Sequence, residues 1–190
     1  EKRTALTFNI SWGDEKVHDI LKVLDKHQVQ ATFFVSGEWA ERHPQIVQQI
    51  TEQGHELGML GYRYKNYLEQ EIDQVRKDIL YAKEVFRKLG YKNITYIRPP
   101  SGLFNEEIID LIEKFDLKAI HWSVNTEDWT NPGVDKIVAK ATAAEGGDII
   151  LMHASDAAKQ TAAALEVIIP DLQKKGFTFV SITELENDLK

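Results

Sequence analysis

The sequence contains no cysteine among its 190 residues, so disulfide bonds and thiolate metal sites are excluded. Long apolar runs are missing as well, since no stretch approaches the ~18–20 residues that a membrane-spanning helix needs. Basic residues are outnumbered by acidic ones, 23 against 30, which gives a net charge of -7. This charge argues against nucleic acid and against anionic membrane surfaces as main partners.

The composition is that of an ordinary globular domain, with 43% hydrophobic and 28% charged residues. A chain of 190 residues can bury one substantial core but is short for two, so a single domain over residues 1–190 is expected. The chain begins at Glu1, directly before an apolar run, and a leader or anchor upstream of it is an open alternative. Membrane insertion of the chain itself is not expected.

Short apolar runs alternate with amphipathic stretches along the whole chain. Strands are predicted at residues 4–8, 31–35, 55–59, 94–97, 117–124, 148–153 and 177–182. Helices are predicted at residues 16–27, 44–53, 68–89, 105–115, 133–144 and 157–175, with a short helix at the carboxyl end. This alternation predicts an α/β fold with a parallel sheet, either curled into a barrel or left open and doubly wound.

Polar clusters follow several of the predicted strands directly. They lie at residues 9–12, 98–100, 125–129 and 153–156. In both candidate architectures the carboxyl ends of the parallel strands meet at one edge of the sheet. The sequence therefore predicts one cleft, lined by the loops that carry these clusters.

Five segments together resemble the signature motifs of the polysaccharide deacetylase family, also called NodB-homology proteins or the fourth family of carbohydrate esterases. They are ALTFNISWGD (5–14), GHELGMLGYRY (54–64), IRPPSG (97–102), SVNTEDW (123–129) and IILMHAS (149–155). The nearest resemblance is to the sporulation-associated PdaB-type branch. The family implies a distorted (β/α)7 barrel and metal-dependent removal of acetyl groups from glycans.

The first two motifs depart from the family pattern. The resemblance places Asn9 at the position of the base aspartate, and Ile10, Leu60 and Tyr64 at the positions of the metal ligands. An amide cannot act as a carboxylate base, and none of the other three side chains is a usual zinc ligand. No metal is therefore expected, and zinc or another divalent ion would bind only at a relocated site.

A shifted alignment offers such a relocated site through Asp14 or His55. Each has a structural alternative. Asp14 fits the start of a helix, and His55 fits a position packed beside the sheet.

The later motifs match better. Arg98 corresponds to the family's arginine that orients the base, and Asp128 is expected to be its partner. His153 corresponds to the general acid. The alternatives are that Arg98 and Asp128 form a buried ion pair joining two loops, and that His153 is a core histidine with satisfied hydrogen bonds.

A substrate pocket is expected around four further residues. Leu151 would form its wall, and Ser101 would offer a backbone N–H to an oxyanion, as the resemblance implies. Trp12 and Trp129 lie on predicted loops of the cleft and could stack on sugar rings.

Two hypotheses for the function follow. The chain is either a degenerate deacetylase that binds N-acetylated glycan with little or no turnover, or an active hydrolase with an altered site. A third, an open-sheet module unrelated to glycans, remains. The expected partner is peptidoglycan or spore cortex, the expected location is extracytoplasmic or spore-associated, and a monomer is expected.

Overall fold

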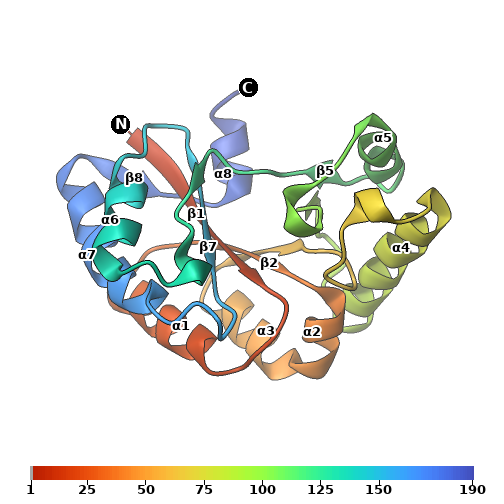
Figure 1. Cartoon of the computed structure of the whole chain (residues 1–190), viewed down its shortest axis with the longest axis horizontal. Coiled ribbons are helices and arrows are strands. Elements are labelled where there is room, and N and C mark those ends of the chain that lie inside the picture. Colours follow the sequence, from red (N-terminus) through yellow and green to blue (C-terminus); the bar gives the residue numbers. More distant parts are fainter. Residues whose placement is uncertain (1) are drawn as a thin grey trace.

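The computed structural model describes residues 2–190 and shows a curled parallel sheet with helices along its outer face (Figure 1). The strands are β1 (Lys2–Ile10), β2 (Thr32–Val35), β3 (Glu56–Met59), β4 (Tyr96–Ile97), β5 (Lys118–Ala119), β6 (Val124–Asn125), β7 (Ile149–His153) and β8 (Phe177–Phe179). The helices are α1 (Lys16–Lys26), α2 (Gly37–Arg42), α3 (Pro44–Glu52), α4 (Ile72–Lys88), α5 (Glu106–Lys114), α6 (Val134–Thr142), α7 (Thr161–Lys174) and α8 (Ile182–Asn187).

The strands pair in the order β5-β4-β3-β2-β1-β7-β6, and β8 pairs with the start of β1. Every pair is parallel. No pairing within residues 2–190 joins β5 to β6, so the curled sheet stays open on that side. The expected distorted (β/α)7 barrel is confirmed as an open, curled form.

The central strand β1 separates the two layers of the core. Leu6, Phe8 and Ile10 belong to the large apolar cluster between the sheet and the helices. Because side chains alternate along a strand, Thr7 and Asn9 face the inside of the barrel. No helix among the described residues is both long and apolar enough to cross a membrane.

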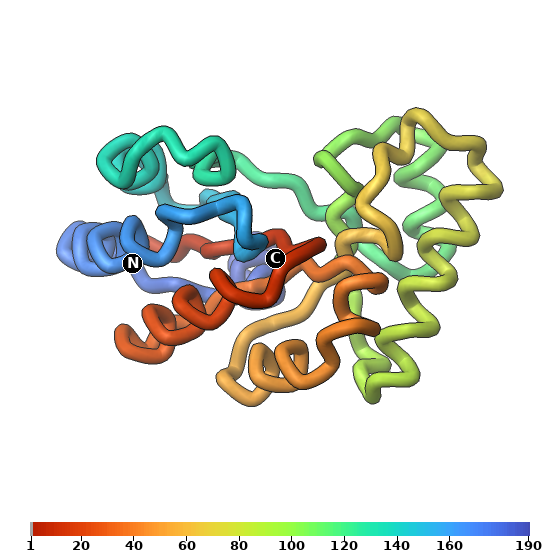
Figure 2. Tube along the Cα trace, turned by 60° about the horizontal axis from the view of Figure 1, so that its bottom comes forward, coloured from red at the N-terminus to blue at the C-terminus, as the bar shows by residue number. Residues whose placement is uncertain are grey.

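The prediction of one strand over residues 117–124 was wrong. The chain forms β5 and β6 instead, two short strands at opposite edges of the sheet. The residues between them cross the open side of the barrel, and Figure 2 shows this segment passing from one half of the molecule to the other. At its two ends, the backbone N–H groups of Ile120 and Ser123 still donate to the carbonyls of Ile97 on β4 and Ile149 on β7.

One predicted helix has a different start, and one helix was missed. The helix predicted at residues 68–89 starts later, because Glu71 and Gln74 form a capping box that begins α4 at Ile72. The short helix α2 was not predicted. The side chain of Ser36 accepts a hydrogen bond from the backbone N–H of Trp39 and so caps its first turn.

The start of α1 is held by a carboxylate from the loop after β7. Asp156 accepts hydrogen bonds from the backbone N–H groups of Asp14, Glu15 and Lys16 at 3.2, 3.0 and 2.9 Å. Gly13 has a φ of +85°, and a Cβ there would lie 2.4 Å from the carboxyl carbon of Asp156. Only glycine fits, and the loops after β1 and β7 are tied together as a result.

His55 packs beside the sheet, just before β3. It is 6% exposed, and its Nδ1 accepts a hydrogen bond of 3.1 Å from the backbone N–H of Ala31. Its ring lies 5.4 Å from that of Phe33. Burial lowers the pKa of His55 from 6.5 to about 4, against the opposing effect of Asp25.

This lowered pKa predicts a loss of stability in acid. His55 is neutral in the fold, whereas the unfolded chain takes up a proton as the pH falls through 6.5. The free energy of unfolding therefore keeps its full value above pH 6.5. It falls by on the order of 2–3 kcal/mol between pH 6.5 and about 4. Urea unfolding of the wild type and of His55→Asn at pH 7.0, 5.5 and 4.5 tests this, since asparagine keeps an acceptor for Ala31 but does not titrate. Equal pH slopes for the two proteins would contradict it.

Candidate functional site

A cleft of about 470 Å³ opens at the carboxyl ends of the strands. It is lined by Asn9, Ser11, Trp12, Leu60, Tyr64, Ser101, Trp122, Asn125, Trp129, Leu151, His153, Ser155, Ala157 and Ala158. The structure thus gathers most of the side chains that the motifs singled out. Arg98 and Asp128 are fully buried beneath the cleft, bonded to Asn9 and His153 respectively.

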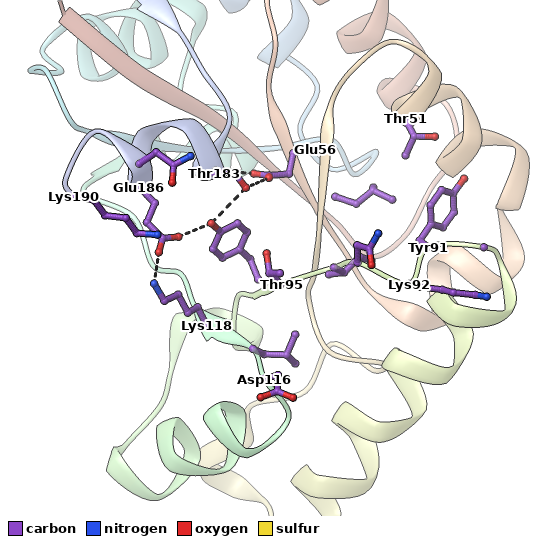
Figure 3. A pocket seen from close by; sticks show the side chains of 17 residues that line it. Thr51, Glu56, Tyr91, Lys92, Thr95, Asp116, Lys118, Thr183, Glu186 and Lys190 are labelled. Atoms are coloured by element: carbon purple, nitrogen blue, oxygen red, sulfur yellow. Dashed lines mark hydrogen bonds and ion pairs between the residues drawn. The ribbon is translucent and has the colours of Figure 1, made fainter.

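A larger hollow, of about 740 Å³, lies at the opposite end of the barrel (Figure 3). The first residues of β3, β4 and β5 contribute to it, and its polar side chains bond to one another. Thr183 donates to Glu56, while Glu186 accepts from Tyr96 and pairs with Lys118. These contacts hold α8 against the amino ends of the strands and give the hollow a structural role.

Arg98 bridges the inside of the barrel. Its Nη1 donates to Thr7 Oγ1 at 3.0 Å and to Asn9 Oδ1 at 2.9 Å, both on β1. Its Nη2 donates to the carbonyl of His121 at 2.8 Å, and its Nε donates to the carbonyl of Ile120 at 3.4 Å. These two carbonyls lie on the segment that crosses between β5 and β6. Arg98 therefore supplies hydrogen bonds that a neighbouring strand would supply in a closed barrel.

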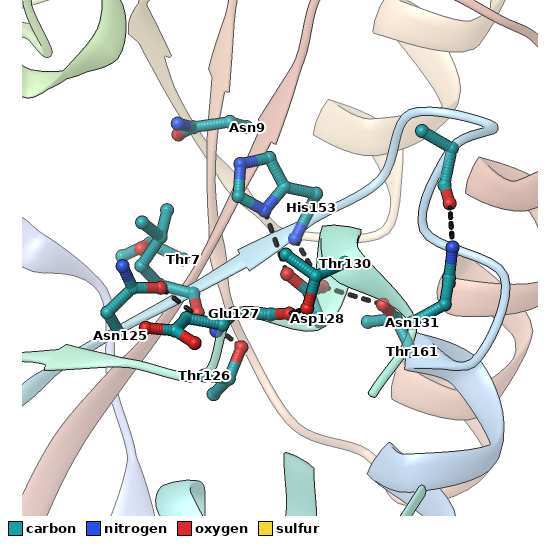
Figure 4. A network of polar contacts seen from close by, with 12 residues as sticks. Thr7, Asn9, Asn125, Thr126, Glu127, Asp128, Thr130, Asn131, His153 and Thr161 are labelled. Atoms are coloured by element: carbon teal, nitrogen blue, oxygen red, sulfur yellow. Dashed lines mark hydrogen bonds and ion pairs between the residues drawn. The ribbon is translucent and has the colours of Figure 1, made fainter. Parts of the chain in front are cut away.

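The expected pairing of Arg98 with Asp128 was wrong. Asp128 accepts three hydrogen bonds from other donors: the backbone N–H of His153 at 2.7 Å, its Nδ1 at 2.8 Å, and Thr161 Oγ1 at 2.6 Å (Figure 4). The order of the strands explains the difference. Asp128 follows β6, which pairs with the strand that carries His153, whereas Arg98 follows β4 on the other side of β1.

Within residues 2–190, the guanidinium of Arg98 thus has no carboxylate among its hydrogen-bond partners. Burial lowers the pKa of Arg98 to about 9, so it is charged at neutral pH. Its central carbon lies 4.2 Å from the ring centroid of Phe34 and 5.3 Å from that of Trp122. Aromatic faces and neutral oxygens together stabilise this buried cation.

His153 presents its imidazole to the floor of the cleft. Asp128 binds Nδ1, and this contact fixes the orientation of the ring and leaves Nε2 on the side of Asn9 (Figure 4). Asn9 and His153 are direct neighbours on β1 and β7. An imidazole held by a buried carboxylate can transfer a proton at this place.

The positions of the family's metal ligands do not provide a donor set. Leu60 is 1% exposed and belongs to the apolar cluster inside the barrel, together with Phe34 and Tyr96. Ile10 points to the helices and does not line the cleft. Tyr64 stands at the rim, 44% exposed, and offers a phenol. These side chains do not fit a divalent metal.

The structure also separates the residues of the alternative metal site. Asp14 follows β1 and lies at the carboxyl edge of the sheet, whereas His55 precedes β3 and lies at the amino edge. Within residues 2–190 no three His, Cys, Asp or Glu side chains are close enough together to hold a metal ion.

Aromatic side chains surround the entrance to the cleft. Trp12 and Trp129 are each 55% exposed, although tryptophan is usually buried. Trp122, which the sequence analysis did not single out, lines the same cleft and stacks on His121 with 3.9 Å between ring centroids. The signal in the sequence that could have identified Trp122 as a cleft residue was its position immediately before the SVNTEDW motif. Flat exposed rings of this kind suit the faces of sugar rings.

Ser101 occupies a constrained loop at the edge of the cleft. Its φ of +60° and ψ of 9° place a non-glycine residue in the left-handed region, which is unfavourable. Gly102 follows with a φ of +70°, and a Cβ there would lie 2.3 Å from the ring of Trp122. The close contact between this loop and Trp122 fixes the backbone of Ser101 at the cleft.

Fold and cleft together define a (β/α)-barrel protein with its site at the carboxyl ends of the strands. The chain matches the family model named polysaccharide deacetylase over residues 1–120. A peptidoglycan-N-acetylglucosamine deacetylase from Bacillus cereus is 33% identical over 189 residues, which cover 97% of this chain and 88% of that protein. The chain belongs to the polysaccharide deacetylase family.

Two other relatives are informative. The crystal structure of a CE4 family pseudoenzyme from Bacillus anthracis superposes with a TM-score of 0.90 at 30% identity, and a mutant of that protein with restored enzymatic activity also gives 0.90. The uncharacterised protein YlxY of Bacillus subtilis is 30% identical over 188 residues. The chain spans 65% of the pseudoenzyme chain and 58% of YlxY.

Proposed function

We propose that this chain binds N-acetylated glycan of the peptidoglycan type in its cleft, and that it is weak or inactive as a metal-dependent deacetylase. The proposal rests on the side chains that line the cleft. Asn9 stands at the base position, and Leu60 buries an apolar side chain at a metal-ligand position. A positioned general base contributes roughly 10²–10⁴ in rate. A metal ion would also activate the attacking water.

Two relatives support the two parts of this proposal, the class of glycan and the weak or absent turnover. The Bacillus cereus protein is named for peptidoglycan N-acetylglucosamine, which suggests the class of glycan. The Bacillus anthracis pseudoenzyme shares the fold, which suggests that the barrel persists when turnover is lost. We further propose that residues 1–190 act as one domain of this family, as a monomer. It would lie outside the cytoplasm or on the spore, as in the PdaB-type branch, with peptidoglycan or cortex as partner.

Binding of chitotetraose, a tetramer of N-acetylglucosamine, tests the proposal. The wild type is expected to bind in a calorimetric titration. Trp12→Ala and Trp129→Ala should each weaken binding about tenfold, which corresponds to roughly 1.4 kcal/mol of lost stacking. Tyr81→Ala is the matched control, because Tyr81 is 64% exposed on α4 and does not line the cleft. Absence of binding, or equal losses in all three variants, would overturn the proposal.

The alternative function is hydrolysis through an altered site. It is favoured by one observation: the contact of 2.8 Å between Asp128 and His153 Nδ1 is in place at the cleft floor. Free acetate is therefore measured in the same samples, alongside a zinc titration of metal-stripped protein. Acetate release that His153→Ala abolishes would establish the hydrolase and overturn the proposal of a protein without turnover.

A further inference from the structure

A second pocket lies between α4 and the loop that joins β3 to it, which passes beside that helix (Figure 2). Its volume is about 510 Å³. It is lined by Tyr62, Arg63, Lys65, Gln70, Gln74, Lys77, Asp78 and Tyr81. Tyr64, on the same loop, lines the cleft instead. The loop therefore separates this pocket from the cleft.

The carboxylate of Asp78 holds the loop in place. Its Oδ2 accepts hydrogen bonds from the backbone N–H of Tyr62 at 2.9 Å and from Tyr67 Oη at 2.5 Å. Its Oδ1 accepts from the backbone N–H of Arg63 at 3.0 Å. Hydrogen bonds to an ionised acceptor are among the stronger ones, so the loop is fixed on α4 before any ligand arrives. A preformed pocket of this kind lowers the cost of ordering on binding.

The lining of the pocket is positively charged, although the chain as a whole has a net charge of -7. Arg63, Lys65 and Lys77 contribute three positive charges and Asp78 one negative charge, which leaves two positive charges (3 − 1 = 2). Glu41 lies at the margin, where it accepts a hydrogen bond from a tyrosine of the pocket. Counting Glu41 still leaves one positive charge. The pocket thus attracts anions on a protein that otherwise repels them.

The cations of the pocket are free to bind a ligand. Within residues 2–190 the side chains of Arg63, Lys65 and Lys77 form no ion pair, and all three residues are exposed. The amide oxygen of Gln74 accepts a hydrogen bond of 3.1 Å from the backbone N–H of Glu71, so its NH₂ group is a further donor. Donors that lack acceptors suit a ligand made of several oxygens.

We propose that this pocket binds a phosphate group carried by a small organic molecule. One arginine is enough to bind a carboxylate through two hydrogen bonds, whereas a doubly charged phosphate can use several cationic donors at once. Sites for small organic ligands measure about 300–1,000 Å³, so this pocket leaves room beside the phosphate for the organic part. The inference goes beyond the proposed function and does not depend on it.

The test compares glucose 6-phosphate with glucose, which lacks only the phosphate, and with inorganic phosphate, which lacks the organic part. In calorimetric titrations at low salt the wild type should bind glucose 6-phosphate with a dissociation constant of about 1 mM or lower. Glucose should show no binding, and inorganic phosphate should bind at least about threefold more weakly. Added salt should weaken the binding of glucose 6-phosphate, because exposed charges are screened.

Two variants place the binding in this pocket. Arg63→Gln and Lys77→Gln should each weaken the binding of glucose 6-phosphate about three- to fivefold, the effect of one exposed charge pair. Lys22→Gln is the matched control, because Lys22 is exposed on α1 and lines neither this pocket nor the cleft. Thermal melts should be unchanged in all three variants, since the replaced side chains form no ion pair.

A further titration with glucose 6-phosphate in the presence of saturating chitotetraose separates the two sites. Unchanged affinity is expected. Displacement by chitotetraose would put the phosphate ligand in the cleft and overturn the inference. Absence of binding, or equal losses in Lys22→Gln, would overturn it as well. Inorganic phosphate that binds as tightly as glucose 6-phosphate would overturn the assignment to an organic phosphate. Absence of chitotetraose binding would overturn the proposed function alone.

Discussion

The variant that carries Asn9→Asp, Ile10→Asp, Leu60→His and Tyr64→His is expected to bind one zinc ion. These changes restore the family's base and its three metal ligands. The aspartate at position 10, the last residue of β1, must turn from the helix side of the sheet to the cleft to join the two histidines. Two histidines and a carboxylate form a common set of ligands for catalytic zinc. We expect metal binding to recover before activity, because rapid hydrolysis needs closer positioning than binding does.

The structure adds a stability effect to this expectation. Ile10 and Leu60 both lie in apolar clusters, so a carboxylate and an imidazole there are buried without partners when metal is absent. The metal-free variant should therefore melt well below the wild type. Zinc at about 1,000 times its dissociation constant should return roughly 4 kcal/mol. Calorimetric titration and thermal melts with and without zinc measure the two effects.

A triple variant that leaves Asn9 unchanged is the matched control. It should bind zinc as the quadruple variant does, but release acetate roughly 10²–10⁴ times more slowly, because it lacks the base. If the quadruple variant folds and takes up no zinc, the assignment of Ile10, Leu60 and Tyr64 to the ligand positions is wrong.

Arg98→Met is expected to cost about 3–5 kcal/mol of folding stability, because each buried acceptor that loses its donor costs roughly 1–3 kcal/mol. Four oxygens lose their donor: the buried side-chain oxygens of Thr7 and Asn9, and the part-buried carbonyls of Ile120 and His121 on the segment that crosses the open side of the barrel. Methionine fills part of the space but cannot donate. The loss should thus come from unsatisfied acceptors more than from a cavity.

Urea unfolding followed by tryptophan fluorescence measures this loss. Arg76→Met is the matched control, because Arg76 pairs with Asp73 on the surface of α4 and its replacement should leave the midpoint unchanged. Arg98→Lys should recover only part of the stability, since an ammonium group cannot reach both β1 and the crossing segment. An Arg98→Met protein as stable as the wild type would mean that other contacts hold the crossing segment.

Much of the fold could be predicted from the pattern of apolar residues. The helices at α1, α3, α6 and α7 were anticipated because their buried faces recur with helical spacing. The same pattern failed at residues 117–124, where mostly apolar residues, interrupted by Lys118, His121 and Ser123, favour one strand. Local sequence does not reveal that the sheet stops there and that the chain must cross its open side.

The candidate site was predictable in its membership and less so in its contacts. The motifs brought Asn9, Arg98, Asp128 and His153 to one place, because each lies at or just after the carboxyl end of a strand of one parallel sheet. Which of them bond to each other depends on the order of the strands in the sheet. The sequence does not reveal this order, and the predicted pairing of Arg98 with Asp128 was wrong for that reason. Trp122 was missed because an aromatic residue near a motif has no spacing that marks it as part of a cleft.

The sequence by itself determined the family, the alternating architecture and the chemistry that position 9 can no longer perform. These depend on the identity of side chains, since an amide cannot take up the proton that a carboxylate does. Only the tertiary structure decided that Leu60 packs among apolar side chains inside the barrel, that Asp128 accepts a hydrogen bond from His153, and that Arg98 donates to the neutral oxygens of Thr7, Asn9, Ile120 and His121. Burial and pairing arise from strand order and packing across the barrel, which bring together residues far apart in the chain.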